Sequence, residues 1–248
     1  MAATPDVRVS ANQQDLFQAA ANLFQEIVRG AVSTRGRCTI ALSGGSTPRG
    51  LFTLLAQEPY RSAIPWSQCE FFWGDERCVP PDDPESNYRM ARETLLDRVP
   101  VPVAHIHRMH GEDPPAQAAE DYERELRRIF ASDGDWPRFD LILLGMGDDG
   151  HTASLFPGSA ALAETQHWVV AHYVEQVHMN RLTLTLPVLN HARHIVFLVS
   201  GASKAPALRT VLASSGGADS LPSARVRPID GQLIWLVDAA AMANERAK

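Results

Sequence analysis

The sequence predicts an α/β fold, with a mostly parallel twisted sheet and helices on both faces. Strand-like and helix-like segments alternate from end to end, which is the pattern of strands joined by helical crossovers. The run 139–144 is almost entirely apolar, as expected of a parallel strand buried on both faces. No internal repeat or shift in composition divides the chain, so we expect one domain spanning residues 1–248.

The first half of the chain predicts four helices and two strands. A helix is expected at 13–32, where apolar residues recur with a period of 3.6 at Leu16, Ala19, Ala20, Leu23, Ile27 and Val28. A strand at 38–42 and a helix at 48–57 follow. The next strand is expected at 69–73, and a loop rich in Pro and Asp leads from it to residue 86. Two helices, at 87–96 and 115–130, complete this half.

The second half is richer in strands. They are expected at 139–144, 168–173, 181–186, 193–199 and 232–237, with a helix at 204–212 between the last two. The carboxyl ends of parallel strands meet at one edge of a sheet, so polar residues that follow these strands are expected to lie close together.

Composition limits the class of protein and its partners. The chain has 248 residues and a formal net charge of −6, so nothing indicates a nucleic-acid or membrane surface. No apolar run is long enough for a membrane span, and the N-terminus lacks the pattern of a signal peptide. The three cysteines, Cys38, Cys69 and Cys78, and the histidines lack the spacing of a metal site. We expect a cytoplasmic protein with free thiols and no metal or cofactor.

The segment 43–49, Ser-Gly-Gly-Ser-Thr-Pro-Arg, runs from a predicted strand into a predicted helix. Thr47 is expected to cap the helix, with Pro48 at its first position. Gly44, Gly45 and Ser46 expose backbone N–H groups at the positive end of the helix, which predicts an anion cradle suited to phosphate. A glycine turn that only joins strand to helix is the alternative.

A second charged segment, Asp75-Glu76-Arg77, comes directly after the strand at 69–73. It is expected in a loop at the same edge of the sheet as the glycines. Arg77 could bind a phosphate or carboxylate, or stabilise an oxyanion. Taken alone, such a run is more typical of a solvated surface loop.

The segment 145–157, Gly-Met-Gly-Asp-Asp-Gly-His-Thr-Ala-Ser-Leu-Phe-Pro, follows the buried strand and combines three glycines with two acids and a histidine. The glycines satisfy the G-x-G-x-x-G pattern of dinucleotide-binding folds. Asp148 and Asp149, however, would repel a pyrophosphate placed there. We interpret His151 as a general base held by a nearby carboxylate, since an imidazole titrates near neutral pH. A structural histidine is the alternative.

Arg181 and Lys204 complete the set of candidate residues. Arg181 opens the alternating run Arg-Leu-Thr-Leu-Thr-Leu, and Lys204 lies at another junction between a strand and a helix. Either cation could contribute to a phosphate pocket, or each could be an ordinary surface charge.

These segments together resemble the 6-phosphogluconolactonase family, the hydrolases of the oxidative pentose phosphate pathway. The resemblance rests on 43–48, 73–77, 85–88, 145–157, 181–185, 201–204 and 230–235. It implies a Rossmann-like fold, shared with glucosamine-6-phosphate deaminases and ribose-5-phosphate isomerase relatives, and hydrolysis of 6-phospho-D-glucono-1,5-lactone without a metal. The deaminases resemble the chain at the glycine loop and at Asp-Gly-His, but they carry a glutamate where this chain has Phe156, which favours the lactonase.

The resemblance also implies roles for the candidate residues. Gly44, Gly45, Ser46, Arg181 and Lys204 would hold the 6-phosphate, and Asp75 would contact the substrate. His151 would activate water, Asp149 would orient the imidazole, and Arg77 would stabilise the oxyanion. We expect a small-molecule partner only, with the protein acting as a monomer or a weak homodimer. A deaminase-like isomerase and a sugar-phosphate sensor that binds without turnover remain as alternative functions.

Overall fold

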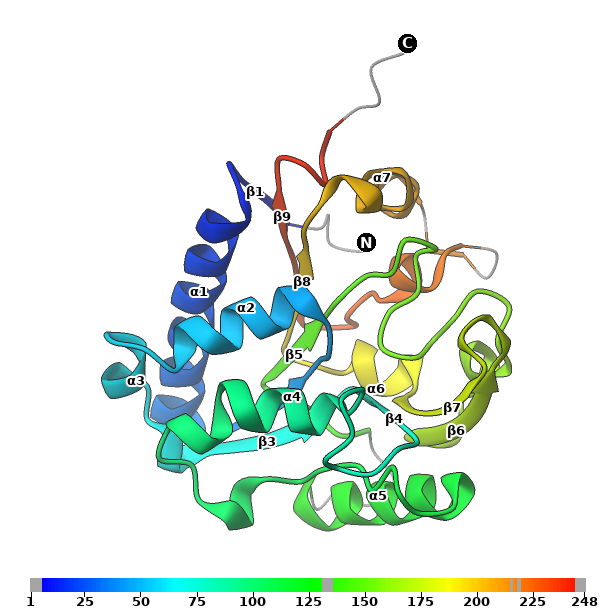
Figure 1. Ribbon diagram of the computed structural model, residues 1–248, viewed down its shortest axis with the longest axis horizontal. Helices are drawn as coiled ribbons and strands as arrows, with labels where there is room; N and C mark the ends of the chain where they lie inside the picture. Colours follow the sequence, from blue (N-terminus) through cyan, green and yellow to red (C-terminus); the bar gives the residue numbers. More distant parts are fainter. Residues whose placement is uncertain (1–5, 131–135, 215, 218–219, 244–248) are drawn as a thin grey trace.

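A six-stranded, wholly parallel sheet forms the centre of the fold (Figure 1). The computed structural model describes residues 6–130, 136–214, 216–217 and 220–243. The strands lie in the order β1 (Asp6–Ser10), β9 (Gln232–Asp238), β8 (His194–Val199), β5 (Leu141–Leu144), β2 (Cys38–Leu42) and β3 (Cys69–Trp73). The predicted α/β fold with a mostly parallel sheet is therefore confirmed.

Helices cover both faces of this sheet, and β3 shows how. Successive side chains of a strand point to opposite faces. Phe71 stacks on Trp66, which in turn packs against Phe24 of α1 (Gln13–Arg35). The next residue, Phe72, contacts Phe130 of α5 (Pro115–Phe130). α1 and α5 therefore bury opposite faces of the sheet.

The remaining helices are short. They are α2 (Ser46–Leu55), α3 (Tyr60–Ala63), α4 (Asn87–Thr94), α6 (Leu186–Asn190) and α7 (Ala205–Ala213). Single 3-10 turns occur at Trp66–Gln68, Leu96–Arg98, Val103–His105, Ala160–Ala163, Glu175–Val177, Ala202–Lys204 and Pro222–Arg225. None of the helices in the described part of the chain is long and apolar enough to cross a membrane.

A second, three-stranded antiparallel sheet stands beside the main one (Figure 1). It consists of β4 (Asp75–Arg77), β7 (Met179–Leu184) and β6 (Val169–Val174), with β7 in the middle. The segment 75–77 was expected to be a loop, and this expectation is wrong because its backbone pairs with β7. The strands expected at 168–173 and 181–186 exist, but they belong to this sheet and not to the parallel one.

The start of α2 also differs from the prediction. The helix begins at Ser46, and its N-cap is Gly45 with φ of 102°, a conformation that glycine adopts without strain. Thr47 therefore lies inside the first turn and is not the cap. The strand β1 was not predicted, since its pattern of exposed and half-buried residues lacks an apolar run.

Candidate active site

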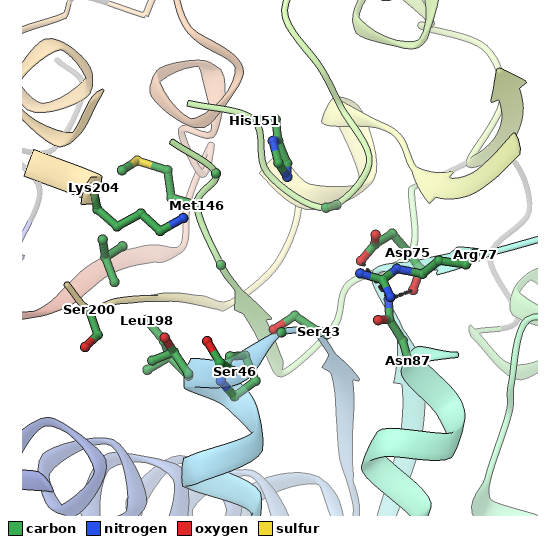
Figure 2. A pocket seen from close by; sticks show the side chains of 18 residues that line it. Ser43, Ser46, Asp75, Arg77, Asn87, Met146, His151, Leu198, Ser200 and Lys204 are labelled. Carbon is green, nitrogen blue, oxygen red and sulfur yellow. Dashed lines mark hydrogen bonds between the residues drawn. The ribbon is translucent and has the colours of Figure 1, made fainter. Parts of the chain in front are cut away.

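A cavity of about 220 Å³ opens where β2, β3, β5 and β8 end at their carboxyl edge (Figure 2). In a parallel α/β sheet, ligands commonly bind in this position. The walls combine the glycine loop after β2, the β4 segment, the loop after β5 and the turn after β8. The lining residues are Ser43, Gly44, Gly45, Ser46, Thr47, Pro48, Asp75, Arg77, Asn87, Gly145, Met146, Gly147, His151, Ala153, Leu198, Val199, Ser200 and Lys204.

The glycine loop brings the N-terminus of α2 to the cavity. Gly44, Gly45 and Ser46 all line it. A Cβ on Gly44 would lie 1.8 Å from Oδ1 of Asn87, so only glycine allows that side chain to approach the loop. The first N–H groups of a helix have no partner within the helix and carry partial positive charge. The wall formed by this loop is therefore suited to an anion.

His151 and Asp149 form a hydrogen-bonded pair in the loop that follows β5. Nδ1 of His151 lies 2.6 Å from Oδ1 of Asp149, and the backbone N–H of His151 donates to the same oxygen at 3.0 Å. A carboxylate can only accept, so in a neutral imidazole the shared proton belongs to Nδ1 and the lone pair is on Nε2. The imidazole side chain is 31% exposed and lines the cavity (Figure 2). It can therefore accept a proton from a molecule bound there.

The pair depends on the glycine at position 147. A Cβ there would lie 2.1 Å from Nδ1 of His151 and 2.6 Å from Oδ1 of Asp149. Burial raises the pKa of Asp149, but the hydrogen bonds from the imidazole and from the backbone N–H of His151 outweigh it and hold the pKa below its usual range. The carboxylate thus stays ionised and can stabilise an imidazolium.

A hydrogen-bond network around Asp75 forms the wall of the cavity that faces Lys204. Oγ of Ser154 donates to Oδ2 of Asp75 at 2.7 Å, and Nδ2 of Asn87 donates to the Asp75 carbonyl at 2.9 Å. Figure 2 shows Asp75, Arg77 and Asn87 together on one side of the cavity, across from Lys204. Asp75 is nearly buried, so its position is fixed before any ligand arrives.

Arg77 and Arg181 lie directly opposite each other in the β4–β7 pairing. Arg77 lines the cavity and donates to the Glu85 carbonyl, while its Nε is buried without a partner among the described residues. Arg181 is only 8% exposed, and its Nε and Nη1 are likewise unpartnered there. Burial lowers the pKa of Arg181, and the positive charge of Arg77 lowers it further. Arg181 is thus the neighbour of Arg77 across the β4–β7 pairing, but it does not itself line the cavity.

Glu76 organises the segment that carries Arg77. Its carboxylate is 2% exposed and accepts hydrogen bonds from the backbone N–H groups of Arg77, Asn87 and Tyr88, and from Oγ of Ser86. These bonds tie β4 to the start of α4. The roles of Glu76, Asn87 and Ser154 could not be predicted, because nothing in the local sequence shows that residues 75, 87 and 154 meet.

Lys204 reaches the cavity from the turn after β8 and forms an ion pair with Asp148, at 2.6 Å between Nζ and Oδ1. This hydrogen bond from Lys204 is the main cause that lowers the pKa of Asp148. The structure thus places seven of the nine predicted site residues in the cavity wall. The other two, Asp149 and Arg181, are outside the wall, where Asp149 is hydrogen-bonded to His151 and Arg181 is paired with Arg77. No group of three or more His, Cys, Asp or Glu is placed to hold a metal within the described residues.

Comparison with known proteins relates this arrangement to one family. The model of glucosamine-6-phosphate isomerases/6-phosphogluconolactonase matches residues 11–235. A 6-phosphogluconolactonase of Synechocystis sp. is 45% identical over 98% of this chain and 99% of its own, and one of Nostoc sp. is 42% identical over 96% and 97%. The solved 6-phosphogluconolactonase of Trypanosoma cruzi superimposes with a TM-score of 0.87 at 29% identity, covering 100% of this chain and 99% of that one.

Proposed function

The chain belongs to the family of glucosamine-6-phosphate isomerases and 6-phosphogluconolactonases, and within it we propose that the protein hydrolyses 6-phospho-D-glucono-1,5-lactone to 6-phospho-D-gluconate in the oxidative pentose phosphate pathway. The curated relatives at 42–45% identity carry the name of this lactonase. The observation that supports this mechanism is the His151–Asp149 pair. Nδ1 of His151 is hydrogen-bonded to the Asp149 carboxylate, and the imidazole ring borders the cavity.

Substrate binding begins at the 6-phosphate. The N-terminus of α2, with Gly44, Gly45 and Ser46, offers N–H donors and a positive end dipole, and Lys204 faces the same cavity. Arg181 adds positive charge from its position beside Arg77 in the β4–β7 pairing. Asp75, held by Ser154 and Asn87, accepts hydrogen bonds from sugar hydroxyls. Together these contacts hold the lactone carbonyl next to His151.

Hydrolysis follows from general base catalysis. Nε2 of His151 takes a proton from a water molecule as its oxygen bonds to the lactone carbonyl carbon. Arg77 stabilises the oxyanion that develops, and Asp149 stabilises the imidazolium. The bond between the carbonyl carbon and the ring oxygen then breaks, and the imidazolium returns its proton to that oxygen. The product is an open-chain carboxylic acid, which releases its remaining proton to solvent and becomes a carboxylate.

The test compares the wild-type protein with His151→Ala. Freshly prepared lactone is supplied at saturation, and 6-phosphogluconate is measured with a coupled dehydrogenase after subtraction of spontaneous hydrolysis. We expect the variant to lose about 10²–10⁴-fold in kcat, while its thermal midpoint and its affinity for 6-phosphogluconate change little. Near-normal turnover by His151→Ala would refute the general base.

The same samples separate the two alternative functions. An amino-sugar phosphate deaminase would release ammonia from glucosamine 6-phosphate, and a sensor would bind 6-phosphogluconate without hydrolysing the lactone. The position of Phe156, stacked on the His151 ring, leaves an apolar side chain where the deaminases carry an acid. We therefore expect no ammonia release.

One chain supplies every residue used in this mechanism. The expected active form is therefore a monomer, with a weak homodimer as the alternative. Sedimentation velocity at the concentrations of the activity assay measures which form is present. If the dimer were required, the specific activity would also fall on dilution, because dilution dissociates the dimer.

A further inference from the structure

A second polar cavity, of about 490 Å³, lies at the opposite edge of the main sheet from the candidate active site. It opens where β2, β5 and β8, which are adjacent in the sheet, begin. Arg37, Asp140 and Arg193 each stand immediately before one of these three strands. The amino ends of parallel strands meet at one edge, so the fold itself gathers these side chains.

Four arginines surround this cavity, although the chain as a whole has a formal net charge of −6. Arg35 is the last residue of α1, and Arg138 precedes β5 by a few residues. One carboxylate lines the cavity together with these four arginines, that of Asp140, whose side chain is 6% exposed and lies near Arg35 and Arg193. Glu70 and Asp230 balance Arg37 and Arg138 at the rim, at 3.0 and 2.9 Å.

Asp140 does not accept a hydrogen bond from every arginine that lies near it. Its Oδ2 accepts from the backbone N–H and Oγ of Thr39, and its Oδ1 accepts from Nε of Arg35 at 2.8 Å. Nε of Arg193 lies 3.4 Å from that same Oδ1 and forms no hydrogen bond with it. The Asp140 carboxylate thus bonds to Thr39 and Arg35 and leaves Nε of Arg193 without a hydrogen-bonding partner in the described part of the chain.

Two guanidinium nitrogens at this cavity, Nε of Arg138 and Nε of Arg193, are buried without a partner among the described residues. Nε of Arg77 is in the same state in the wall of the candidate active site, where an anionic substrate is expected. Two further atoms of this kind, Nε of Arg92 and Nε of Arg181, line neither cavity. A buried donor without a partner is unfavourable, and an anion that supplies several acceptor oxygens would relieve it.

The wall beside the arginines is aromatic. Trp136 lines the cavity and stacks on His191, with ring centroids 5.8 Å apart and planes at 25°. Planar guanidinium groups match phosphate oxygens in pairs, and an indole offers a surface on which a base can stack. We propose that this arginine cavity binds an oligophosphate anion, of the kind carried by nucleotides, at a site separate from the active site.

The test measures binding of sodium tripolyphosphate and of ATP to the intact protein by calorimetry, at low ionic strength and without divalent metal. The test variant is Arg138→Gln/Arg193→Gln. The matched control, Arg124→Gln/Arg209→Gln, removes two exposed arginines from α5 and α7. Thermal midpoints of all proteins verify folding, and Arg138→Lys/Arg193→Lys keeps the charge where the glutamine variant is unstable.

The expected result is saturable binding that weakens about tenfold or more in the test variant, stays within about twofold in the control, and survives saturating 6-phosphogluconate. Tripolyphosphate binding as tight as ATP would identify the oligophosphate alone as the ligand. Tighter binding of ATP that is lost in Trp136→Leu would identify a nucleotide. Absence of saturable binding, equal binding by the test variant, or displacement by 6-phosphogluconate would overturn the proposal.

Discussion

The phenyl ring of Phe156 stacks on the imidazole of His151, with ring centroids 4.1 Å apart and planes at 25°. Phe156 is 5% exposed and so is fixed by the core around it. Asp149 holds the edge of the same imidazole at Nδ1. Stacking restrains the plane of the ring and the hydrogen bond restrains its rotation, so the proposed base is oriented before substrate binds.

This stacking predicts the effect of Phe156→Leu. An aromatic pair contributes about 0.5–1.5 kcal/mol beyond its buried area, so a less restrained imidazole is expected to lower kcat about 3–10-fold with little change in KM. Steady-state kinetics with correction for spontaneous hydrolysis measure this. Phe24→Leu, which disrupts a distant aromatic pair with Trp66, is the control for general loss of packing. Equal kcat in the two variants would mean that Phe156 is only a core residue.

A substitution at Gly147 is expected to lower kcat more than Phe156→Leu, because it disturbs the His151–Asp149 pair directly. A Cβ at this position overlaps both His151 and Asp149, so Gly147→Ala must separate them. We expect kcat to fall about 100-fold or more, as for loss of general base catalysis. Gly145→Ala is the matched control, because a Cβ there meets nothing within 4 Å and the backbone has no positive φ. If Gly147→Ala retained the activity of Gly145→Ala, the orientation of His151 by Asp149 would not matter for catalysis.

Glu76 predicts a link between stability and substrate binding. Glu76→Gln replaces one acceptor oxygen by an NH₂ group that faces backbone N–H donors, which is expected to cost about 1–3 kcal/mol of unfolding free energy. KM should rise because Arg77 and Asn87 lose their anchor. Urea unfolding and kinetics measure the two effects. Glu93→Gln, at an exposed pair with Arg89, is the control and should change neither. A Glu76→Gln protein as stable as wild type would contradict this role.

The parts of the fold that were predicted correctly are those with strong local signals. The strands at 38–42 and 69–73 and the helix at 115–130 match the structure to the residue, because buried apolar runs and a long amphipathic pattern define them locally. The strand β4 was missed because three charged residues become a strand only through pairing with β7, about a hundred residues away. Tertiary pairing of this kind leaves no trace in local sequence.

The candidate site likewise contains contacts that are local in sequence and contacts that depend on tertiary structure. Asp149 and His151 are two residues apart, so their contact follows from the local turn and could be expected from sequence. The approach of Ser154 to Asp75, and the packing of Asn87 against Gly44, depend on how distant loops meet. The placement of Arg181 beside Arg77 follows from the register of β4 and β7, which no sequence pattern gives.

His172 predicts a pH dependence of stability. Its Nε2 donates to the Ser154 carbonyl at 2.7 Å. Burial lowers the pKa of His172 and the charge of Arg181 lowers it further, although the hydrogen bond to Ser154 acts in the opposite direction. Below a pH of about 6.5, where an unfolded histidine takes up a proton, the unfolded chain binds a proton that the folded chain resists. Stability is therefore expected to fall as the pH drops through that value, and to level off below the native pKa.

The variant His172→Asn removes this contribution. Urea unfolding at pH 7.5 and at pH 5 is expected to show a smaller loss of stability on acidification than in the wild type. His178→Asn serves as the control, because His178 is exposed in a left-handed turn conformation that asparagine also adopts. Identical pH dependence in His172→Asn and the wild type would show that His172 does not carry the effect.

Lys204 predicts a separation of binding from chemistry. Its ion pair with Asp148 joins a lysine side chain that is 26% exposed to a carboxylate that is 63% exposed, and such a pair contributes little to stability. A phosphate with two negative charges would compete well for the ammonium. Lys204→Gln is therefore expected to raise KM about 10–100-fold, as for loss of a charged hydrogen bond. The value of kcat should change little, because the 6-phosphate is remote from the bond that breaks.

The control variant is Asp148→Asn, which removes the competing carboxylate and should leave KM unchanged or lower. Kinetics of both variants decide the role of the pair: if KM rose equally in Lys204→Gln and Asp148→Asn, the pair would be needed to shape the loop, and Lys204 would not be the phosphate ligand.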